Sequence, residues 1–229
     1  MQQNSNPAKN MAGFSLVELL IAMTVTLVML GIATTALTTG YRIRDREESV
    51  TDAAADAQRA LNIMSREIAN AGFNLNTNGV VPGDSSATSI RIRSNLNKYD
   101  PTASQASQTG VIDPGEDIKY FVNTANNTDY LVRLDVNSTG NKTTVLANRV
   151  DQIRIHYFAQ KTTYTTADCD ISGASNGEVD PSLAAYIVMA VCVRIPASGS
   201  PNTAGYQPAS NVLLVSDVTL RNSTLLANY

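Results

Sequence analysis

One long apolar segment near the N-terminus constrains this chain more than any other feature of its sequence. Between Phe14 and Gly40 the only charged side chain is Glu18. As a helix, this segment would extend roughly 40 Å, which exceeds the hydrocarbon thickness of about 30 Å in a typical bilayer. Its Leu, Ile, Val and Phe side chains favour insertion, and a carboxylate near one end opposes insertion less than one at the centre. The segment therefore predicts a membrane-spanning helix.

Composition excludes several function classes. The formal net charge of −3 excludes a strongly basic nucleic-acid binder. The single histidine, His156, and the two cysteines, Cys169 and Cys192, are too few for a His-cluster metal site, a Cys-rich zinc site or an iron–sulfur cluster. The motifs GxxxxGK(S/T), GxGxxG and GxSxG are absent. We therefore predict no enzyme, no cofactor and no metal site, and the composition does not indicate a nucleic-acid partner.

The start of the apolar segment carries a specific motif. The small residue Gly13 precedes the segment and nothing like A-x-A follows it, so cleavage at Gly13 would leave the apolar helix on the mature protein. Residues 13–23 read GFSLVELLIAM. This run resembles the class III signal of type IV prepilins and type II secretion pseudopilins. The resemblance implies cleavage between Gly13 and Phe14 by prepilin peptidase, N-methylation of Phe14, and an assembly role for Glu18.

The acidic residue has a physical reason to pair with another subunit. A carboxylate in hydrocarbon needs a partner, and the resemblance implies that this partner is the charged N-terminus of a neighbouring subunit. The attraction would set the axial register between subunits. The alternative is that Glu18 only reaches the cytoplasmic interface of an ordinary anchor.

The resemblance also implies partners and a location. The partners are other major and minor pilins, prepilin peptidase, the inner-membrane assembly platform and the inner membrane. The N-terminus would be cytoplasmic and the C-terminal domain periplasmic before assembly, and the protein would lie in the pilus at the cell surface afterwards. Counting Lys and Arg favours the opposite orientation, because Lys9 precedes the span and Arg42, Arg44 and Arg46 follow it.

The helix is predicted to continue beyond the membrane. No proline occurs between Pro7 and Pro82, and Gly72 is a candidate stop. One helix from about Phe14 to Ala71 would be roughly 90 Å long. We expect residues 14–40 to span the membrane and residues 41–72 to pack on a sheet. The apolar stripe that would face this sheet is Val50, Ala54, Ala57, Leu61, Met64 and Ile68.

Residues 73–229 are expected to form a β-rich domain. Their composition shifts to Asn, Thr, Ser and Gly, with short alternating apolar runs between turn signals. Antiparallel pairing is expected because no helix-length crossover intervenes. The fold class is therefore α+β, with a long N-terminal helix packed on antiparallel β-sheets, and the resemblance implies a type IV pilin-like fold. The expected strands are Ser89–Arg93, Asp117–Asn123, Tyr130–Val136, Thr143–Ala147, Val150–Phe158, Ala185–Ile195 and Asn211–Leu220.

Several short runs in this domain resemble one branch of the family, the PilW-type minor pilins and the J-type minor pseudopilins of type II secretion. The runs are PGEDIKY (114–120), LVR (131–133), VDQIRIHY (150–157) and LRN (220–222). This resemblance implies a minor pilin that primes polymerisation near the pilus tip, with a type II secretion pseudopilin as the alternative. The long Asn- and Thr-rich loops leave open a third interpretation, a tip module that binds a surface, DNA or an adhesin.

The two cysteines are expected to pair in the exported domain. Under the implied topology Cys169 and Cys192 lie in an oxidising compartment, where two cysteines pair by default. The bridge would close a loop of about 24 residues and contribute roughly 3 kcal/mol. The alternative is a free Cys192 that acts as a small apolar residue inside a strand.

Residues 159–184 contain the remaining candidate site. Asp168, Asp170, Glu178 and Asp180 could hold a hard cation such as calcium, but their spacing does not match an EF-hand, which favours a solvated acidic loop. His156 is expected at a strand surface with no catalytic role, since no nucleophile pairs with it in the sequence.

Overall fold

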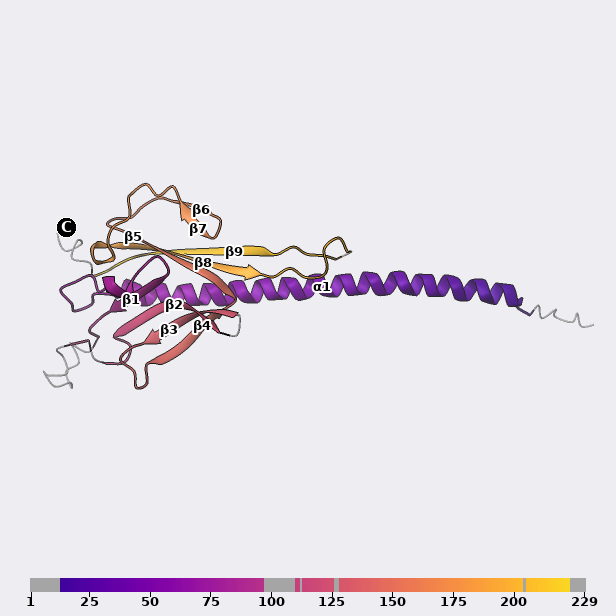
Figure 1. Cartoon of the computed structure of the whole chain (residues 1–229), viewed down its shortest axis with the longest axis horizontal. Coiled ribbons are helices and arrows are strands. Elements are labelled where there is room, and N and C mark those ends of the chain that lie inside the picture. Colours follow the sequence, from indigo (N-terminus) through magenta and orange to yellow (C-terminus); the bar gives the residue numbers. More distant parts are fainter. Residues whose placement is uncertain (1–12, 97–109, 112, 126–127, 204, 223–229) are drawn as a thin grey trace, which may run out of the picture.

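The computed structural model describes residues 13–96, 110–111, 113–125, 128–203 and 205–222. Residues 1–13 are the leader that the predicted cleavage would remove, and all of them except Gly13 lie outside the described residues. One long helix, α1 (Leu16–Ala69), packs through its C-terminal part against antiparallel sheets and projects far beyond them (Figure 1). The predicted α+β fold class is confirmed.

The helix ends two residues earlier than predicted. Asn70 is its C-cap, and Gly72 then reverses the chain with a φ of +76°. A Cβ at Gly72 would lie 2.6 Å from the carbonyl oxygen of Thr77, so both the backbone angle and the close approach require glycine. The predicted stop signal therefore acts just beyond the last helical residue.

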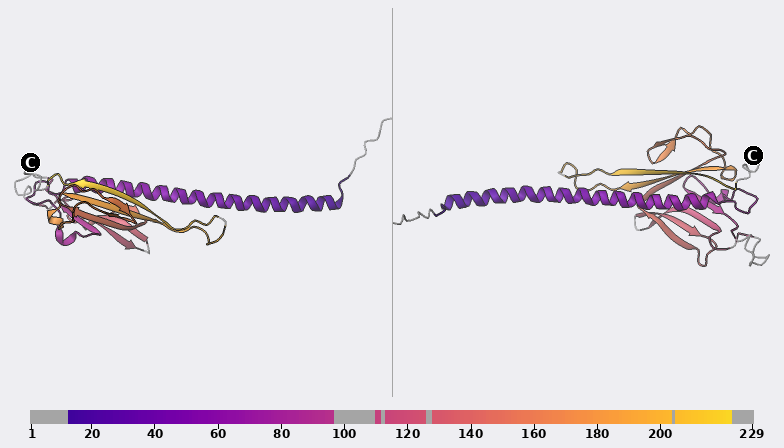
Figure 2. Two further views of the ribbon diagram at one scale, coloured as in Figure 1. Left: turned by 90° about the horizontal axis from the view of Figure 1, so that it is seen from above. Right: turned by 180° about the vertical axis from the view of Figure 1, so that it is seen from behind.

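Two antiparallel sheets flank α1. Sheet A contains β1 (Ser89–Arg93), β2 (Asp117–Ala125), β3 (Thr128–Asp135) and β4 (Lys142–Asn148), in that order. Sheet B contains β5 (Val150–Phe158), β8 (Tyr186–Ile195) and β9 (Ser210–Thr219), in the order β5-β8-β9. The helix contacts β4 on one side and β8 and β9 on the other, so it lies along the line between the sheets (Figure 1 and Figure 2).

The seven predicted strands are present, with ends that differ by at most two residues from the prediction. The structure adds two strands of three residues, β6 (Thr165–Ala167) and β7 (Asp170–Ser172), inside the predicted 159–184 loop. Strands this short carry too few alternating residues to be seen in the sequence. Two short 3-10 helices, Pro82–Asp84 and Pro181–Leu183, complete the described elements.

The main core lies between α1 and the two sheets. Ala57, Leu61, Met64 and Ile68 of the predicted stripe are fully buried, while Ala53 rather than Ala54 continues the stripe toward the N-terminus. These residues pack against apolar side chains of both sheets, including Ile90, Tyr120, Leu131, Ile153, Ile155, Ile187, Met189 and Val191.

Residues 159–184, which we call the flap, cover the face of sheet B that points away from α1 (Figure 1). The odd-numbered residues of β8, such as Ile187 and Met189, belong to the main core. The even-numbered Tyr186 and Val188 pack with flap residues Tyr164 and Ile171 in a second, smaller cluster. Strand β8 is therefore buried on both faces, although its sequence alternation predicts one.

Candidate functional site

The N-terminal part of α1 is exposed at every residue up to Thr38. Every large apolar side chain from Phe14 to Leu37 is at least 52% exposed. The helix contains a window of mean hydropathy 2.4 with no buried residue, and by length and composition it can cross a membrane. An apolar surface of this size marks a membrane or a protein interface.

The predicted processing and assembly residues lie together at the tip of this helix. Gly13 and Phe14 precede the helix, which begins with extended Ser15 as its N-cap. Among the described residues, no atom beyond the chain neighbours of Gly13 would lie within 4 Å of a Cβ at this position. Glu18 lies in the first turn and is exposed, and no hydrogen bond or ion pair from the described residues reaches its carboxylate.

Threonine hydroxyls in the exposed half are satisfied within the helix itself. Thr26 Oγ1 donates to the carbonyl oxygen of Ala22 at 2.8 Å, and Thr35 Oγ1 donates to that of Gly31 at 2.7 Å. Thr24, Thr34 and Thr38 make equivalent bonds. Because each hydroxyl has an acceptor one turn back, these side chains can enter hydrocarbon without an unpaired polar group.

Residues 8–34 match a known family described as the prokaryotic N-terminal methylation motif. The match supports a type IV prepilin-like protein. It contains Gly13, Phe14 and Glu18, and it favours a structural protein over an enzyme. Together with the apolar helix, the motif suits a protein anchored in the inner membrane. No curated protein and no solved structure matches the chain.

The two cysteines are joined in the structure. Cys169 of the flap and Cys192 of β8 form a disulfide with a Cα–Cα distance of 5.1 Å. The bond ties the flap to the face of sheet B that it covers.

His156 lies on the outer face of β5, where the sequence analysis places it, but it is covered rather than solvated. Its Nε2 is 2.6 Å from Asp170 Oδ1, and its Nδ1 is 2.8 Å from Glu178 Oε1. Burial alone would lower the pKa of His156, but the hydrogen bonds to Glu178 and Asp170 outweigh it and raise the pKa above its ordinary value. Two members of the predicted acidic loop therefore hold the flap to sheet B through the two ring nitrogens of one histidine.

A third member of the acidic loop, Asp180, has a local structural role. Asp180 accepts hydrogen bonds from the backbone nitrogen and the hydroxyl of Ser182, at 2.9 and 2.5 Å, and so caps a 3-10 helix. No group of three His, Cys, Asp or Glu side chains in the described part of the chain is placed to hold a metal ion.

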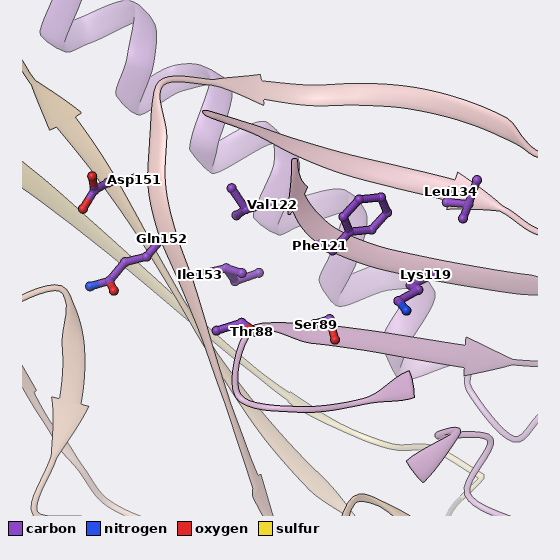
Figure 3. A pocket seen from close by; sticks show the side chains of 9 residues that line it. All are labelled: Thr88, Ser89, Lys119, Phe121, Val122, Leu134, Asp151, Gln152 and Ile153. Atoms are coloured by element: carbon purple, nitrogen blue, oxygen red, sulfur yellow. The ribbon is translucent and has the colours of Figure 1, made fainter. Parts of the chain in front are cut away.

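A hollow in the β domain lies between sheet A and β5, with a volume of about 450 Å³ (Figure 3). Its walls are mainly apolar, formed by Phe121, Val122 and Ile153. Lys119, at its rim, is occupied by an ion pair of 2.9 Å with Asp84.

A polar clamp between α1 and sheet A was not predicted. Glu67 accepts a hydrogen bond from the hydroxyl of Tyr120 and pairs with Arg133 Nε at 3.0 Å. The partners are separated by 53 and 66 residues from Glu67, so no local sequence signal could have revealed the clamp. The clamp joins the C-terminal part of α1 to β2 and β3 of sheet A.

Proposed function

We propose that this chain is a minor pilin of the PilW type that takes part in type IV pilus assembly. The observation that carries the proposal is the bare apolar half of α1, with a single carboxylate at its tip and a folded β domain at its other end. A helix this apolar must be covered by lipid or by similar helices, which is the requirement of a subunit that moves from a membrane into a filament.

Processing prepares the tip for pairing. Cleavage after Gly13 leaves the amine of Phe14 as a positive charge next to the first helical turn. In the filament this amine pairs with the Glu18 carboxylate of a neighbouring subunit. Two unit charges 4 Å apart attract by roughly 4 kcal/mol at an effective dielectric constant of 20, and water exclusion strengthens the attraction. The pairing sets the axial register of the packed helices.

The same proposal assigns a location and partners to the chain. The N-terminus is cytoplasmic and the β domain periplasmic before assembly. The partners are prepilin peptidase, the inner-membrane assembly platform, and major and minor pilins. As a minor subunit the chain primes polymerisation and lies near the pilus tip.

Glu18→Ala tests the pairing. The variant removes the carboxylate and leaves the apolar surface unchanged, so the membrane-bound amount should stay at the wild-type level. The amount in sheared filaments should fall at least tenfold, measured by immunoblot. Glu47→Ala, an exposed acid on the same helix beyond the apolar segment, is the matched control and should assemble normally. Normal incorporation of Glu18→Ala rejects the pairing.

Mass spectrometry of the mature chain tests the processing step. We expect a polypeptide that begins with N-methylated Phe14. A mature chain that begins at Met1 would contradict the proposal. Loss of surface pili in a deletion strain supports the pilus role, whereas a secretion defect with normal pili points to the type II secretion alternative.

A further inference from the structure

The connection between β8 and β9 reaches along α1 as far as the end of the apolar segment. Residues 196–203 and 205–209 of this connection, which we call the arm, project from the β domain toward the N-terminal half of the helix (Figure 1). A Cβ at Gly205 would lie 3.0 Å from the side chain of Thr39. Thr39 precedes Gly40, the last residue of the apolar segment. The arm therefore ends against the last turn of that segment.

Arg46 of α1 holds the arm in this position. Its guanidinium donates to the carbonyl oxygens of Pro196, at 3.1 Å, and Gln207, at 3.4 Å. It also donates to the carbonyl oxygen of Pro208 and to Ser210 Oγ. Pro196 lies on the side of the arm that leaves β8, and the other acceptors lie on the side that enters β9. One side chain therefore bonds to both sides of the arm and fixes its place along the helix.

The end of the arm lies at the depth of the lipid headgroups when α1 spans a membrane. A hydrocarbon core of about 30 Å takes about 20 helical residues. If the core begins at Phe14, it ends near Thr34, and Thr39 lies roughly 8 Å beyond it. If the core begins at Glu18, it ends next to Thr39. The headgroup layer extends about 5–8 Å beyond the hydrocarbon on each side, so both placements put the end of the arm in this layer.

The arm carries side chains that suit the headgroup layer. Between Arg194 and Asp217 the sequence has no charged residue, so the arm can enter the layer without taking a charge out of water. Tyr206 lies at its end, next to the glycine that meets the helix, and Tyr41 of α1 is 64% exposed two residues beyond Thr39. Tyrosine is enriched at this depth because its ring is apolar and its hydroxyl is polar.

Positive charge lies nearer to the end of the arm than negative charge does. Arg42 is exposed, and no hydrogen bond or ion pair reaches its guanidinium from the described part of the chain. A Cβ at Gly199 of the arm would lie 3.8 Å from Arg42 Nη1. The first acid beyond the apolar segment is Asp45, roughly 9 Å farther along the helix than Thr39. The end of the arm is therefore next to a free guanidinium and away from the acids of the β domain.

The composition of the arm disfavours a neighbouring helix as the partner at its end. From Pro196 to Ala209 the sequence has no Leu, Ile, Val, Met or Phe. Packing against an apolar helix would therefore bury little apolar area. The headgroup layer is polar, and contact with it does not require a large apolar surface.

We infer that the end of the arm is a phospholipid-binding site. Tyr206, Tyr41 and Arg42 lie in the headgroup layer of the periplasmic leaflet, where the guanidinium binds a lipid phosphate and the rings lie at the edge of the acyl chains. The inference rests on the membrane-anchored state in the proposed function. It adds a second membrane contact, which holds the β domain at a fixed distance from the bilayer until the subunit leaves for a filament.

Tryptophan fluorescence can measure the depth of the arm, because the chain has no tryptophan of its own. The full chain with Tyr206→Trp is reconstituted at low density in vesicles of phosphatidylcholine and phosphatidylglycerol. The vesicles carry a spin label either on the headgroup or near the middle of the acyl chain. We expect the headgroup label to quench this variant at least threefold more strongly than the acyl label. Leu27→Trp should show the opposite order, and Tyr164→Trp in the flap, the matched control, should be quenched by neither label.

Further substitutions test how the arm is held and what it binds. Arg46→Gln, added to Tyr206→Trp, removes the bonds to both sides of the arm and should lower headgroup quenching at least threefold. Arg42→Gln should lower it about twofold, because the tyrosines remain. Arg59→Gln, at an exposed arginine far along α1, is the control and should leave the quenching unchanged.

The outcomes separate this inference from the proposed function. If the acyl label quenches Leu27→Trp but only aqueous iodide quenches Tyr206→Trp, the arm lies in water, the inference is wrong and the proposed function stands. If neither lipid labels nor iodide reach Tyr206→Trp, another protein copy covers the arm and the inference is again wrong. Ser200→Trp, at an exposed position of the arm, must agree with Tyr206→Trp. If no lipid label quenches Leu27→Trp, the helix does not span the membrane, and the proposed function fails as well.

Discussion

The two halves of α1 share one continuous backbone and differ in what covers them. Leu27 in the N-terminal half is 66% exposed, whereas Leu61 in the C-terminal half is fully buried. The more apolar half is the bare one, so hydrophobicity alone does not decide which half enters the core. The C-terminal half contacts the sheets through a narrow stripe in which Ala53, Ala57 and Ala60 allow close approach. The difference shows that one half stabilises the domain and the other is available to other molecules.

The largest expected effect comes from a leucine truncation in each half. Leu61→Ala should lower the free energy of unfolding of the β domain by about 3 kcal/mol, because it leaves a cavity under two sheets. Leu27→Ala should leave it unchanged. Denaturant titration of the full chain in detergent micelles measures both variants, and an equal loss in the two would break the division between the halves.

The disulfide allows the flap to be compared with the two halves of α1. Replacing Cys169 and Cys192 together by alanine should lower the free energy of unfolding by roughly 3 kcal/mol. Hydrogen exchange should show the loss of protection concentrated in the flap and β8. Exchange that also accelerates in residues 16–37 would show that the bare half depends on the domain after all.

The hydrogen bond from Tyr120 to Glu67 belongs to the half of α1 that packs on the sheets. Burial raises the pKa of Tyr120 far above its ordinary value, so its hydroxyl stays protonated and donates to Glu67. Tyr120→Phe should cost about 1.5 kcal/mol of unfolding free energy, as expected for a hydrogen bond to a charged group. Tyr130→Phe, in the neighbouring strand, is the control and should have little effect. If the denaturation curve of Tyr120→Phe equals that of the wild type, the hydrogen bond adds no stability beyond that of the apolar packing.

The smallest effect is the pH dependence of the flap. Both ring nitrogens of His156 face carboxylates, and only the protonated ring can donate to both. Because the pKa of the folded state is raised, this stabilisation is complete below about pH 6.5 and is lost as pH rises through the raised pKa. Thermal melts from pH 5 to 9 should show the loss in the wild type. In His156→Gln this component should be missing, and an unchanged pH profile would reject the clamp.

The sequence predicted most of the fold because the signals are local. The apolar segment, the helical stripe around Leu61 and the alternation in β5 and β8 each depend on neighbouring residues. The two strands of the flap were missed because three residues carry no readable period. His156 was expected at a strand surface, but its cover by the flap was not predicted, because its partners, 14 and 22 residues away, belong to a loop whose path the sequence does not show.

For the candidate site, the sequence by itself determined the motif around Gly13, Phe14 and Glu18, because covalent order places these residues together. Only the tertiary structure decided that the flap shields β8, that Glu67 contacts Tyr120 and Arg133 of sheet A, and that Arg149 joins the two sheets with a φ of +59°. Those relations join segments far apart in the chain. They depend on how two sheets and one helix pack in three dimensions, and no local pattern of residues records that packing.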